Sequence, residues 1–255
     1  MLHHGGEPGR WGSLGLWEEH TPDYAAACRA LALRLGTAAG LRAGDRVLGI
    51  ACGAGEELAL WRDRCGARET IGIDADAGAC VRARAAGLDA RHEDFRHPPD
   101  GPFDRVLCVD AAYHLSPRAA FLTTAHSALR EGGGLAFTDL VLDGPATPVI
   151  RAAARLCGID PRCLQDEEGA LLRLREAGFG GTRCERLDDA VLGGFAGFAG
   201  RQARTLGLRR LRPAWLGAAI TAGLIPPARA RGLGYALFSG FALPRSALAC
   251  SRDWV

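Results

Sequence analysis

Val-Leu-Gly-Ile-Ala-Cys-Gly-Ala-Gly, residues 47–55, is the stretch that decides the fold. Its short apolar run ends in a glycine-rich turn, and residues 56–65 continue with the apolar spacing of a helix. A strand, a glycine turn and a helix in this order form the first unit of nucleotide-binding α/β folds. Gly53 and Gly55 favour such a site, because a side chain at either position would hold a ligand away from the backbone.

The composition limits the class of protein. The chain has 255 residues, a hydrophobic fraction of 48% and a net charge of +2, which fits one large domain or a domain with an appendage. It has no long basic run, so nucleic acid is not expected as a partner, because phosphate binding needs clustered positive charge. All 31 basic residues are arginine, which excludes a lysine Schiff base or a P-loop lysine.

The nine cysteines are scattered, and no two form a C-x-x-C pair. Several lie in apolar runs, where Cys behaves as a small buried side chain. This usage predicts a reducing, cytoplasmic setting without disulfides, and no metal site is expected. The N-terminus lacks the apolar core of a signal peptide, and no apolar run reaches the roughly 20 residues that cross a bilayer.

Apolar strands alternate with amphipathic helices over about the first 141 residues. We expect a helix from Thr21, as its N-cap, to about Leu35, and strands at 46–51, 69–74, 88–92, 103–110 and 135–141 with helices at 56–65, 76–86 and 117–130 between them. Beyond them we expect helices at 148–157 and 166–177, strands at 182–187 and 234–243, and helices within 190–231 that break at Pro213 and Pro226-Pro227.

This alternation predicts an α/β fold: a Rossmann-like, doubly wound, mostly parallel seven-stranded sheet with helices on both faces and a helical cap. Residues 1–40 are expected to form an N-terminal arm and helix that act as a lid, and 41–142 the ligand-binding core. Residues 143–255 are expected to complete the sheet and to carry the cap around 190–231. Ligands of such sheets bind beyond the carboxyl ends of the strands.

Asp74 ends the second strand, about 20 residues after the glycine turn, where a carboxylate can accept both hydroxyls of a ribose. The alternative is an N-cap for the next helix, a role for which Asp76 competes. A dinucleotide is not favoured, because Leu58 stands where the fingerprint needs a third glycine. Glu56 and Glu57 would also repel a pyrophosphate at the helix N-terminus, so a less anionic nucleoside fits better.

Five motifs in order resemble those of the class I S-adenosylmethionine-dependent methyltransferases. Residues 47–55 are similar to the first motif, 71–74 to the ribose-binding strand end, and 92–95 to the third-strand motif. Residues 103–115 resemble the fourth strand with its substrate-facing end, and 129–139 the turn into the fifth strand. The resemblance covers about residues 40–140.

The resemblance implies S-adenosylmethionine as cofactor and methyl transfer to a small molecule. Asp94 would then bond the adenine amino group, and Phe95 would contact the adenine ring. Gly49 departs from the family pattern, because it stands where the family usually has an acid that helps to hold the methionine portion. The implied cofactor contacts are Ala51, Cys52, Gly53, Gly55, Asp74, Ala75, Asp94, Phe95 and Asp110.

His114 is the first candidate for a general base, since it lies past the fourth strand and has a near-neutral reference pKa. The alternative is a helix-start residue with a satisfied hydrogen bond. Tyr113 is expected to orient the substrate or to form a wall of the pocket. Asp139 either binds substrate or caps a loop. Trp17 and Tyr24 either close over the methionine end with the substrate or pack the first helix.

The substrate class is indicated only by residues 190–231, where apolar faces alternate with arginines. As a lid, this segment suits an apolar small molecule of secondary metabolism; as an ordinary amphipathic cap, it says nothing of the substrate. A protein or RNA substrate is not favoured, because the sequence has no basic groove and no Asn-Pro-Pro-Tyr-like motif after the fourth strand. Two alternatives stay open: the fold reused for cyclisation or isomerisation, and a non-catalytic binding subunit. A homodimer is also left open.

Overall fold

Seven strands form a single sheet in the computed structural model, which describes residues 11–206, 213–244 and 246. The strand order is β3-β2-β1-β4-β5-β7-β6, and only β7 runs antiparallel to its neighbours. This confirms the predicted Rossmann-like, mostly parallel sheet. The strands are β1 Arg46–Ile50, β2 Glu69–Asp74, β3 Asp89–His92, β4 Phe103–Cys108, β5 Leu129–Leu142, β6 Phe179–Arg186 and β7 Leu233–Ala242.

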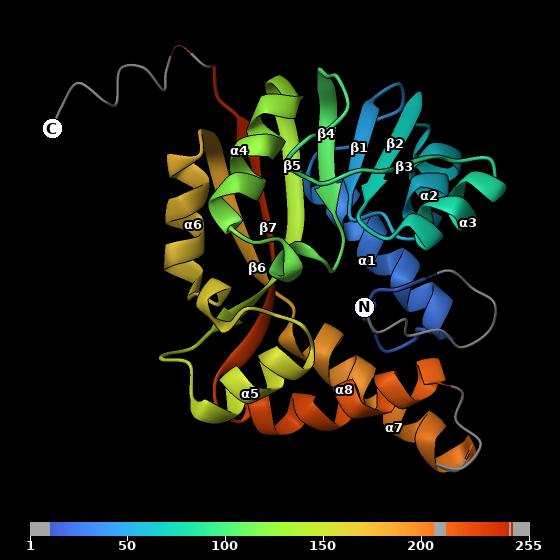
Figure 1. Ribbon diagram of the computed structural model, residues 1–255, viewed down its shortest axis with the longest axis vertical. Helices are drawn as coiled ribbons and strands as arrows, with labels where there is room; N and C mark the ends of the chain where they lie inside the picture. Colours follow the sequence, from blue (N-terminus) through green and yellow to red (C-terminus); the bar gives the residue numbers. More distant parts are fainter. Residues whose placement is uncertain (1–10, 207–212, 245, 247–255) are drawn as a thin grey trace, which may run out of the picture.

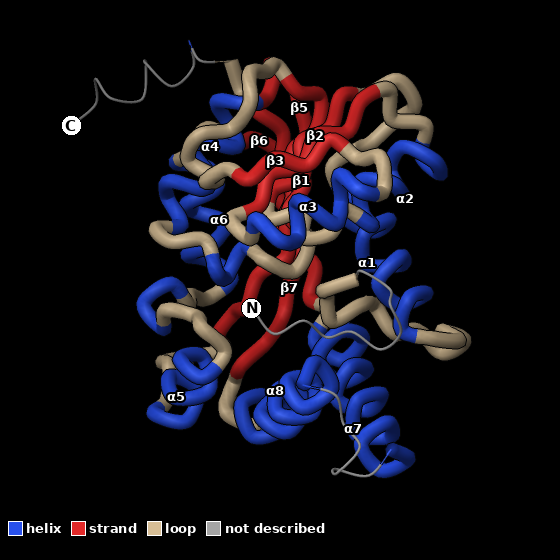
Figure 2. Tube along the Cα trace, turned by 45° about the vertical axis from the view of Figure 1, so that its right-hand side comes forward, coloured by secondary structure: helices blue, strands red, loops and turns tan. Residues whose placement is uncertain are grey.

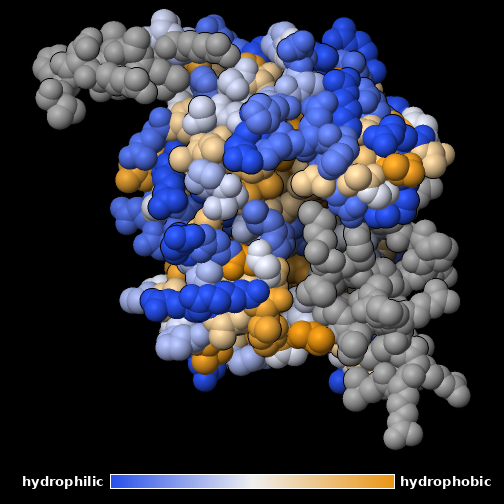
Figure 3. Space-filling model, in the orientation of Figure 1, coloured by the Kyte–Doolittle hydropathy of each residue, from blue (hydrophilic) through white to orange (hydrophobic). Residues whose placement is uncertain are grey.

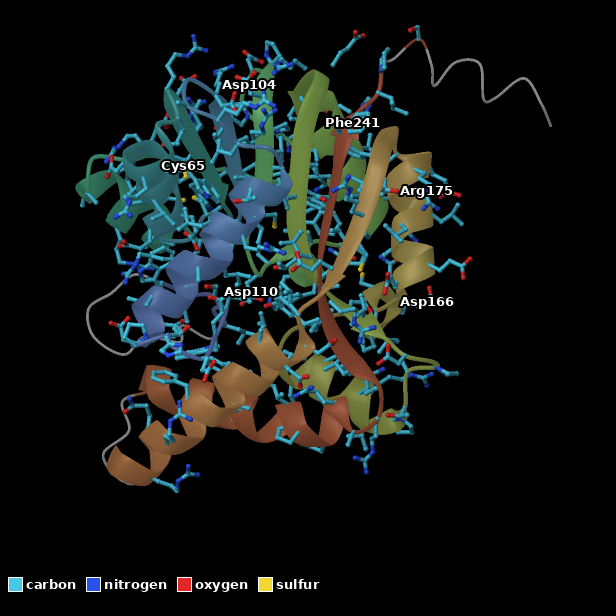
Figure 4. The ribbon with its side chains drawn as sticks, turned by 180° about the vertical axis from the view of Figure 1, so that it is seen from behind. Cys65, Asp104, Asp110, Asp166, Arg175 and Phe241 are labelled. Atoms are coloured by element: carbon cyan, nitrogen blue, oxygen red, sulfur yellow. The ribbon has the colours of Figure 1, made fainter. Side chains whose placement is uncertain are left out.

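Helices cover both faces of the sheet, with α4 in front of it in Figure 1 and α1 in front when it is seen from behind in Figure 4. None of the described helices is both long and apolar enough to cross a membrane. The helices are α1 Tyr24–Ala38, α2 Glu56–Cys65, α3 Ala77–Ala85, α4 Arg118–Ala128, α5 Pro148–Leu156, α6 Glu167–Glu176, α7 Gly194–Leu206 and α8 Pro213–Arg229, with short helices at Ala112–His114, Pro161–Cys163 and Asp188–Gly193.

The side chains of β1 alternate between two hydrophobic cores. Val47 packs into the core that contains Leu31 and Leu35 of α1. Leu48 and Ile50 pack into the core that contains residues of α4 and α6. Successive side chains of a strand point to opposite faces of the sheet. Because both faces of β1 are buried, all of residues 47–50 are apolar.

Helices α5, α7 and α8 form a layer beyond one end of the sheet (Figure 1). Figure 2 shows that β7 extends from the sheet into this layer. A short helix at Asp188–Gly193 connects β6 to α7. The predicted helical cap is therefore present, although residues 207–212 and the side chains of 205–218 lie outside the described part of the chain.

Three local predictions were wrong. Helix α1 is capped by Asp23, whose carboxylate accepts from the Ala26 amide at 2.7 Å, and not by Thr21, which accepts from Glu18 N. The residues 132–134 lie inside β5, not in a turn before it. A Cβ at Gly134 would come 2.0 Å from the Ala39 carbonyl oxygen, so the strand passes too close to the end of α1 for any other residue.

The third wrong prediction is the break at Pro226-Pro227, since α8 continues through both residues to Arg229. Both prolines are exposed and lie in the last turns of the helix. They remove only their own backbone N–H groups there, and packing of Ile225 and Ala228 against the rest of the protein holds the helix together.

Two glycines that pair across β1 and β2 let α2 lie close to the sheet. Gly49 is the register partner of Gly72. A Cβ at Gly72 would come 2.5 Å from Cys52 Sγ and 2.6 Å from Leu58 Cδ1, and one at Gly49 would come 2.8 Å from Leu58 Cδ2. The glycine pair therefore makes room for Leu58, which is fully buried.

We expect Gly72→Ala to lower the free energy of unfolding by about 1–3 kcal/mol, because the added methyl group overpacks a filled core. Gly223→Ala in α8 is the matched control, since nothing lies within 4 Å of its Cβ position; it should be neutral or stabilising by up to about 1 kcal/mol. Urea denaturation of both variants measures the difference. Equal stability of the two variants would contradict this account of the glycine pair.

Candidate functional site

A cavity of about 510 Å³ lies where the carboxyl ends of β1, β2 and β4 face the cap. Its other walls come from the arm at residues 11–14 and from α5 and α8. Figure 4 shows Asp110 between that end of the sheet and the cap helices, with Asp104 of β4 at the opposite end. The position agrees with the ligand site expected for a sheet of this topology.

The cavity brings together half of the residues predicted from the sequence. Those that line it are Ala51, Cys52, Gly53, Asp74, Asp110, Tyr113 and His114. Those that do not line it are Gly55, Ala75, Asp94, Phe95, Trp17, Tyr24 and Asp139.

The glycine turn presents backbone to the cavity. Gly53 has φ +54°, and a Cβ there would meet nothing within 4 Å, so its open side can receive a ligand. Gly55 has a different role: its φ is +84°, and a Cβ there would come 2.7 Å from Leu88 Cδ1. Gly55 is therefore needed for the turn and for packing, and only Gly53 meets the requirement for ligand approach.

Asp74 organises the turn as well as the cavity wall. Its Oδ2 accepts from the Gly53 amide at 2.7 Å, and its Oδ1 accepts from the Asp76 amide at 2.8 Å. Asp76, not Asp74, is the N-cap of α3, with bonds from Gly78 N and Ala79 N. Each carboxylate oxygen has a further lone pair, so Asp74 can still accept hydrogen bonds from a ligand in the cavity.

Asp110 is the buried centre of a hydrogen-bond network that joins three parts of the chain. The Leu14 amide donates to its Oδ2, while the Tyr113 and Tyr235 hydroxyls donate to its Oδ1 at 2.8 and 2.6 Å. Burial raises the pKa of Asp110 to about 6, and the hydrogen bonds from Tyr235, Leu14 and Tyr113 act in the opposite direction. Its φ of +52° lies in the left-handed region, which residues other than glycine seldom adopt.

Tyr113 and His114 follow Asp110 on a short helix and line the cavity beside it. The His114 Nδ1 lies 3.4 Å from the Gly158 carbonyl oxygen. A carbonyl can only accept, so in the neutral ring Nδ1 carries the proton and Nε2 is free to accept another. Burial lowers the pKa of His114 below its usual value, which keeps the ring neutral at pH 7.

Asp94 and Phe95 lie outside the cavity wall. Both Asp94 oxygens receive hydrogen bonds from the Arg96 guanidinium, which holds the pKa of that carboxyl well below its usual range. Phe95 packs partly against the core beneath α4. Their predicted contacts with adenine stay predictions, as does the contact of Ala75.

Trp17 and Tyr24 hold the arm in place and do not line the cavity. The Trp17 ring stacks on Phe198 of α7 at 4.6 Å, and the Tyr24 hydroxyl donates to the Ser13 carbonyl at 2.6 Å. The packing alternative for these residues therefore fits the geometry. Ser13 and its neighbours Trp11 and Leu14 line the cavity instead.

Asp139 is engaged below the cavity in a buried ion pair with Arg118 of α4, at 2.8 Å. It also accepts a hydrogen bond from the Leu140 amide. With both kinds of partner inside the protein, we do not assign it to the substrate.

Two charged residues of the cavity wall were missed in the sequence. Glu57 of α2 and Arg82 of α3 both line it. In the sequence, Glu57 was interpreted only as a charge that would repel a pyrophosphate. Nothing distinguished Arg82 from the other arginines. Among the described residues, the cavity wall thus carries the carboxylates of Glu57, Asp74 and Asp110 against one guanidinium, a balance that favours a cationic ligand over a polyanion.

The chain is similar to known methyltransferases. Residues 47–133 match the family described as "Methyltransferase domain". The chain belongs to the class I S-adenosylmethionine-dependent methyltransferases. It is 28% identical to erythromycin 3''-O-methyltransferase of Saccharopolyspora erythraea over 210 residues, which cover 74% of this chain and 68% of that enzyme.

A second relative is 27-O-demethylrifamycin SV methyltransferase of Amycolatopsis mediterranei, 32% identical over 137 residues. The alignment covers 50% of each chain, so this methyltransferase spans about half the length of that relative. Among solved structures, the [4+2]-cyclase SpnF superposes with a TM-score of 0.72 at 21% identity, over 90% of this chain and 87% of that one. This last likeness shows the shared fold.

We expect Asp110→Ala to lower the free energy of unfolding by about 1–3 kcal/mol, because three donors lose their acceptor. The arm should also become more accessible to protease, since the Leu14 amide no longer has its partner. Urea denaturation and limited proteolysis measure the two effects, with Asp63→Ala as a control for an exposed carboxylate. Unchanged stability together with an intact arm would show that the network does not hold the arm.

We expect Asp74→Ala to weaken binding of S-adenosylhomocysteine by about 1.5–3 kcal/mol, the range for a charged hydrogen-bond partner. Isothermal titration calorimetry measures the change, and Asp89→Ala on exposed β3 should leave it unaltered. Affinity equal to that of the wild type would remove Asp74 from the cofactor site.

Proposed function

We propose that this methyltransferase transfers the methyl group of S-adenosylmethionine to a hydroxyl group of an apolar small molecule bound in the same cavity. The observation that carries the proposal is the division of the cavity wall. Its carboxylates and exposed glycine backbone lie at the sheet end, and apolar side chains of α5 and α8 lie opposite.

The residues present fit the cofactor. Asp74 would accept from the ribose hydroxyls, and Gly53 would allow the ligand to approach the backbone. Contacts of Asp94 and Phe95 with the adenine stay predictions, because neither residue lines the cavity. The sulfonium of the cofactor supplies an already activated methyl group. The protein therefore has to align the acceptor atom and exclude water, and the arm at residues 11–14 closes the cavity on that side.

The substrate side of the cavity is almost wholly apolar. Residues of α5, α8 and β7 form this wall, which suits a large hydrocarbon-rich surface. The buried Thr221 Oγ1 has no hydrogen-bond partner in the described part of the chain, so it is available to one polar group of the substrate. The apolar residues of this wall are Ile150, Ala153, Ala154, Ile159, Leu224, Ile225, Ala228 and Leu233.

Figure 3 shows a group of hydrophobic residues in the lower part of this face, among hydrophilic ones, where α5 and α8 lie. Among the described residues, Val149 and Leu156 of α5 and Ile220 of α8 are large apolar side chains that are exposed. Together with the two relatives, named as an erythromycin 3''-O-methyltransferase and a 27-O-demethylrifamycin SV methyltransferase, this supports a bulky secondary metabolite as substrate.

His114 is suited to accept the proton that a hydroxyl group loses on methylation. Its neutral ring has Nε2 unprotonated, and it stands on the cavity wall next to Tyr113. Tyr113 itself is a poor base, because its hydroxyl donates to Asp110 and burial raises its pKa well above the usual value. Tyr113 therefore serves to orient the substrate or to shape the wall.

Cyclisation or isomerisation is the competing function, favoured by the absence of the usual acid at Gly49 and compatible with the fold shared with SpnF. Incubation of the protein with methyl-labelled S-adenosylmethionine and a panel of hydroxylated macrolactones separates the two. A product heavier by one methylene, with release of S-adenosylhomocysteine, supports methyl transfer. A product of unchanged mass would overturn the proposal, and absence of cofactor binding would favour a non-catalytic subunit.

We expect His114→Ala to slow turnover roughly 100- to 10,000-fold, the usual contribution of a general base, with little change in cofactor affinity. In the wild type, kcat/KM should fall as the pH drops through a pKa below 6.5, because protonation blocks Nε2. Initial rates over a pH series measure both effects, with His20→Ala as a control on the exposed surface. A wild-type rate in His114→Ala would exclude it as the base.

A further inference from the structure

We propose that Glu57 supplies the carboxylate that binds the ammonium group of the cofactor's methionine portion, in place of the acid that the family usually carries at the position of Gly49. This inference rests on the proposed binding of S-adenosylmethionine in the cavity. It assigns a positioning role to a residue of α2, not of β1.

An acid at Gly49 would force packed side chains to move. A Cβ there would lie 2.8 Å from Leu58 Cδ2 and 3.5 Å from Trp61 Cζ3. Leu58 and Trp61 are buried, and the Trp61 indole donates to the Ala32 carbonyl of α1 at 3.1 Å. The tryptophan is therefore fixed from both sides, and a carboxylate on β1 would have to displace the packing between α1 and α2.

The Glu57 side chain reaches the part of the cavity that an acid at position 49 would line. It lines the main cavity together with Ala51 and Cys52 of the glycine turn. It also lines a small hollow that contains Gly49 and Trp61. The Glu57 carboxylate thus extends from α2 into the region where the family's usual acid would extend from β1.

Among the residues that the structure describes, none supplies a cation to the Glu57 carboxylate. Within the described part of the chain, no hydrogen bond or ion pair joins its side chain to another residue, and its only bond is with its own backbone. Burial raises its pKa to about 7, and the carboxylates of Glu56, Asp110 and Asp74 add to the rise. The ionised form of a half-buried acid among other acids is unfavourable without a cation. An ammonium group beside Glu57 would stabilise that ionised form.

The surroundings of Glu57 place it near the arm, as the methionine end requires. Its charge acts on Tyr24 and Cys28 of α1 and on Cys52 of the turn, and these three groups are neutral at pH 7 because burial raises their pKa values. Glu56 on the same helix, Asp110 beyond β4 and Asp74 on β2 are the other titratable groups whose charges act on it. Glu57 and Asp110 thus present two carboxylates to one cationic ligand.

This arrangement predicts that cofactor binding releases a proton from Glu57. Since the free protein holds the pKa of Glu57 near 7, a bound ammonium group favours the ionised form and lowers that pKa. Binding therefore releases a proton at and below pH 7, and the affinity for the cofactor falls as the pH is lowered from 8 towards 5.5.

The test compares Glu57→Gln with Glu56→Gln by isothermal titration calorimetry at pH 8. Glu56→Gln removes the same charge one residue earlier on α2, at a side chain that lines neither cavity. The two probes are S-adenosylhomocysteine, which carries the ammonium group, and 5'-methylthioadenosine, which lacks the amino-acid portion. Glu57→Gln should bind S-adenosylhomocysteine roughly 10- to 100-fold more weakly and methylthioadenosine as the wild type does.

Each outcome distinguishes this inference from the proposed function. Wild-type affinity of Glu57→Gln for S-adenosylhomocysteine, or equal loss of both probes, overturns the role of Glu57 while cofactor binding stands. Failure of the wild type to bind S-adenosylhomocysteine overturns the proposed function itself. Retained methylthioadenosine binding shows that the variant is folded, and the pH dependence between 8 and 5.5 should be weaker in Glu57→Gln than in Glu56→Gln.

Discussion

The buried carboxylate of Asp110 is the constraint on which the site depends. A carboxylate in this position has to be surrounded by donors, and they come from the arm (Leu14), from the short helix after β4 (Tyr113) and from the last strand (Tyr235). Satisfying one side chain therefore assembles three distant segments around the end of the sheet. The arm forms one wall of the cavity, and this network holds it there together with Trp17 and Tyr24.

The core of the fold was predictable because its signals are local. The strand at 46–51 and the helix at 56–65 were predicted at nearly their observed bounds. A continuous apolar run indicates a strand buried on both faces, and apolar spacing indicates a helix, and both patterns depend only on neighbouring residues. The errors arose where tertiary neighbours decide. Residue 134 is a glycine inside a strand, where a Cβ would come 2.0 Å from the Ala39 carbonyl oxygen. The neighbours of residue 134 in the sequence do not indicate this contact.

The site was predicted in the same uneven way. Gly53 and Asp74 lie on the cavity because turn chemistry fixes them, whereas Trp17 and Asp139 found partners inside the protein, Phe198 and Arg118. Glu57 was seen but misread, because an acid in the first turn of a helix is also an ordinary response to the helix dipole. Only the packing of Leu58 and Trp61 over Gly49 reveals why this particular acid matters.

The central claim is that the cavity at the carboxyl ends of the strands holds the methyl donor against an apolar substrate wall. A crystal structure of the protein with S-adenosylhomocysteine tests it most directly. We predict the ribose hydroxyls within hydrogen-bonding distance of Asp74 and the amino-acid portion beside Ala51 and Gly53, with the space next to α5 and α8 left for substrate. Electron density for the ligand outside this cavity would contradict the account.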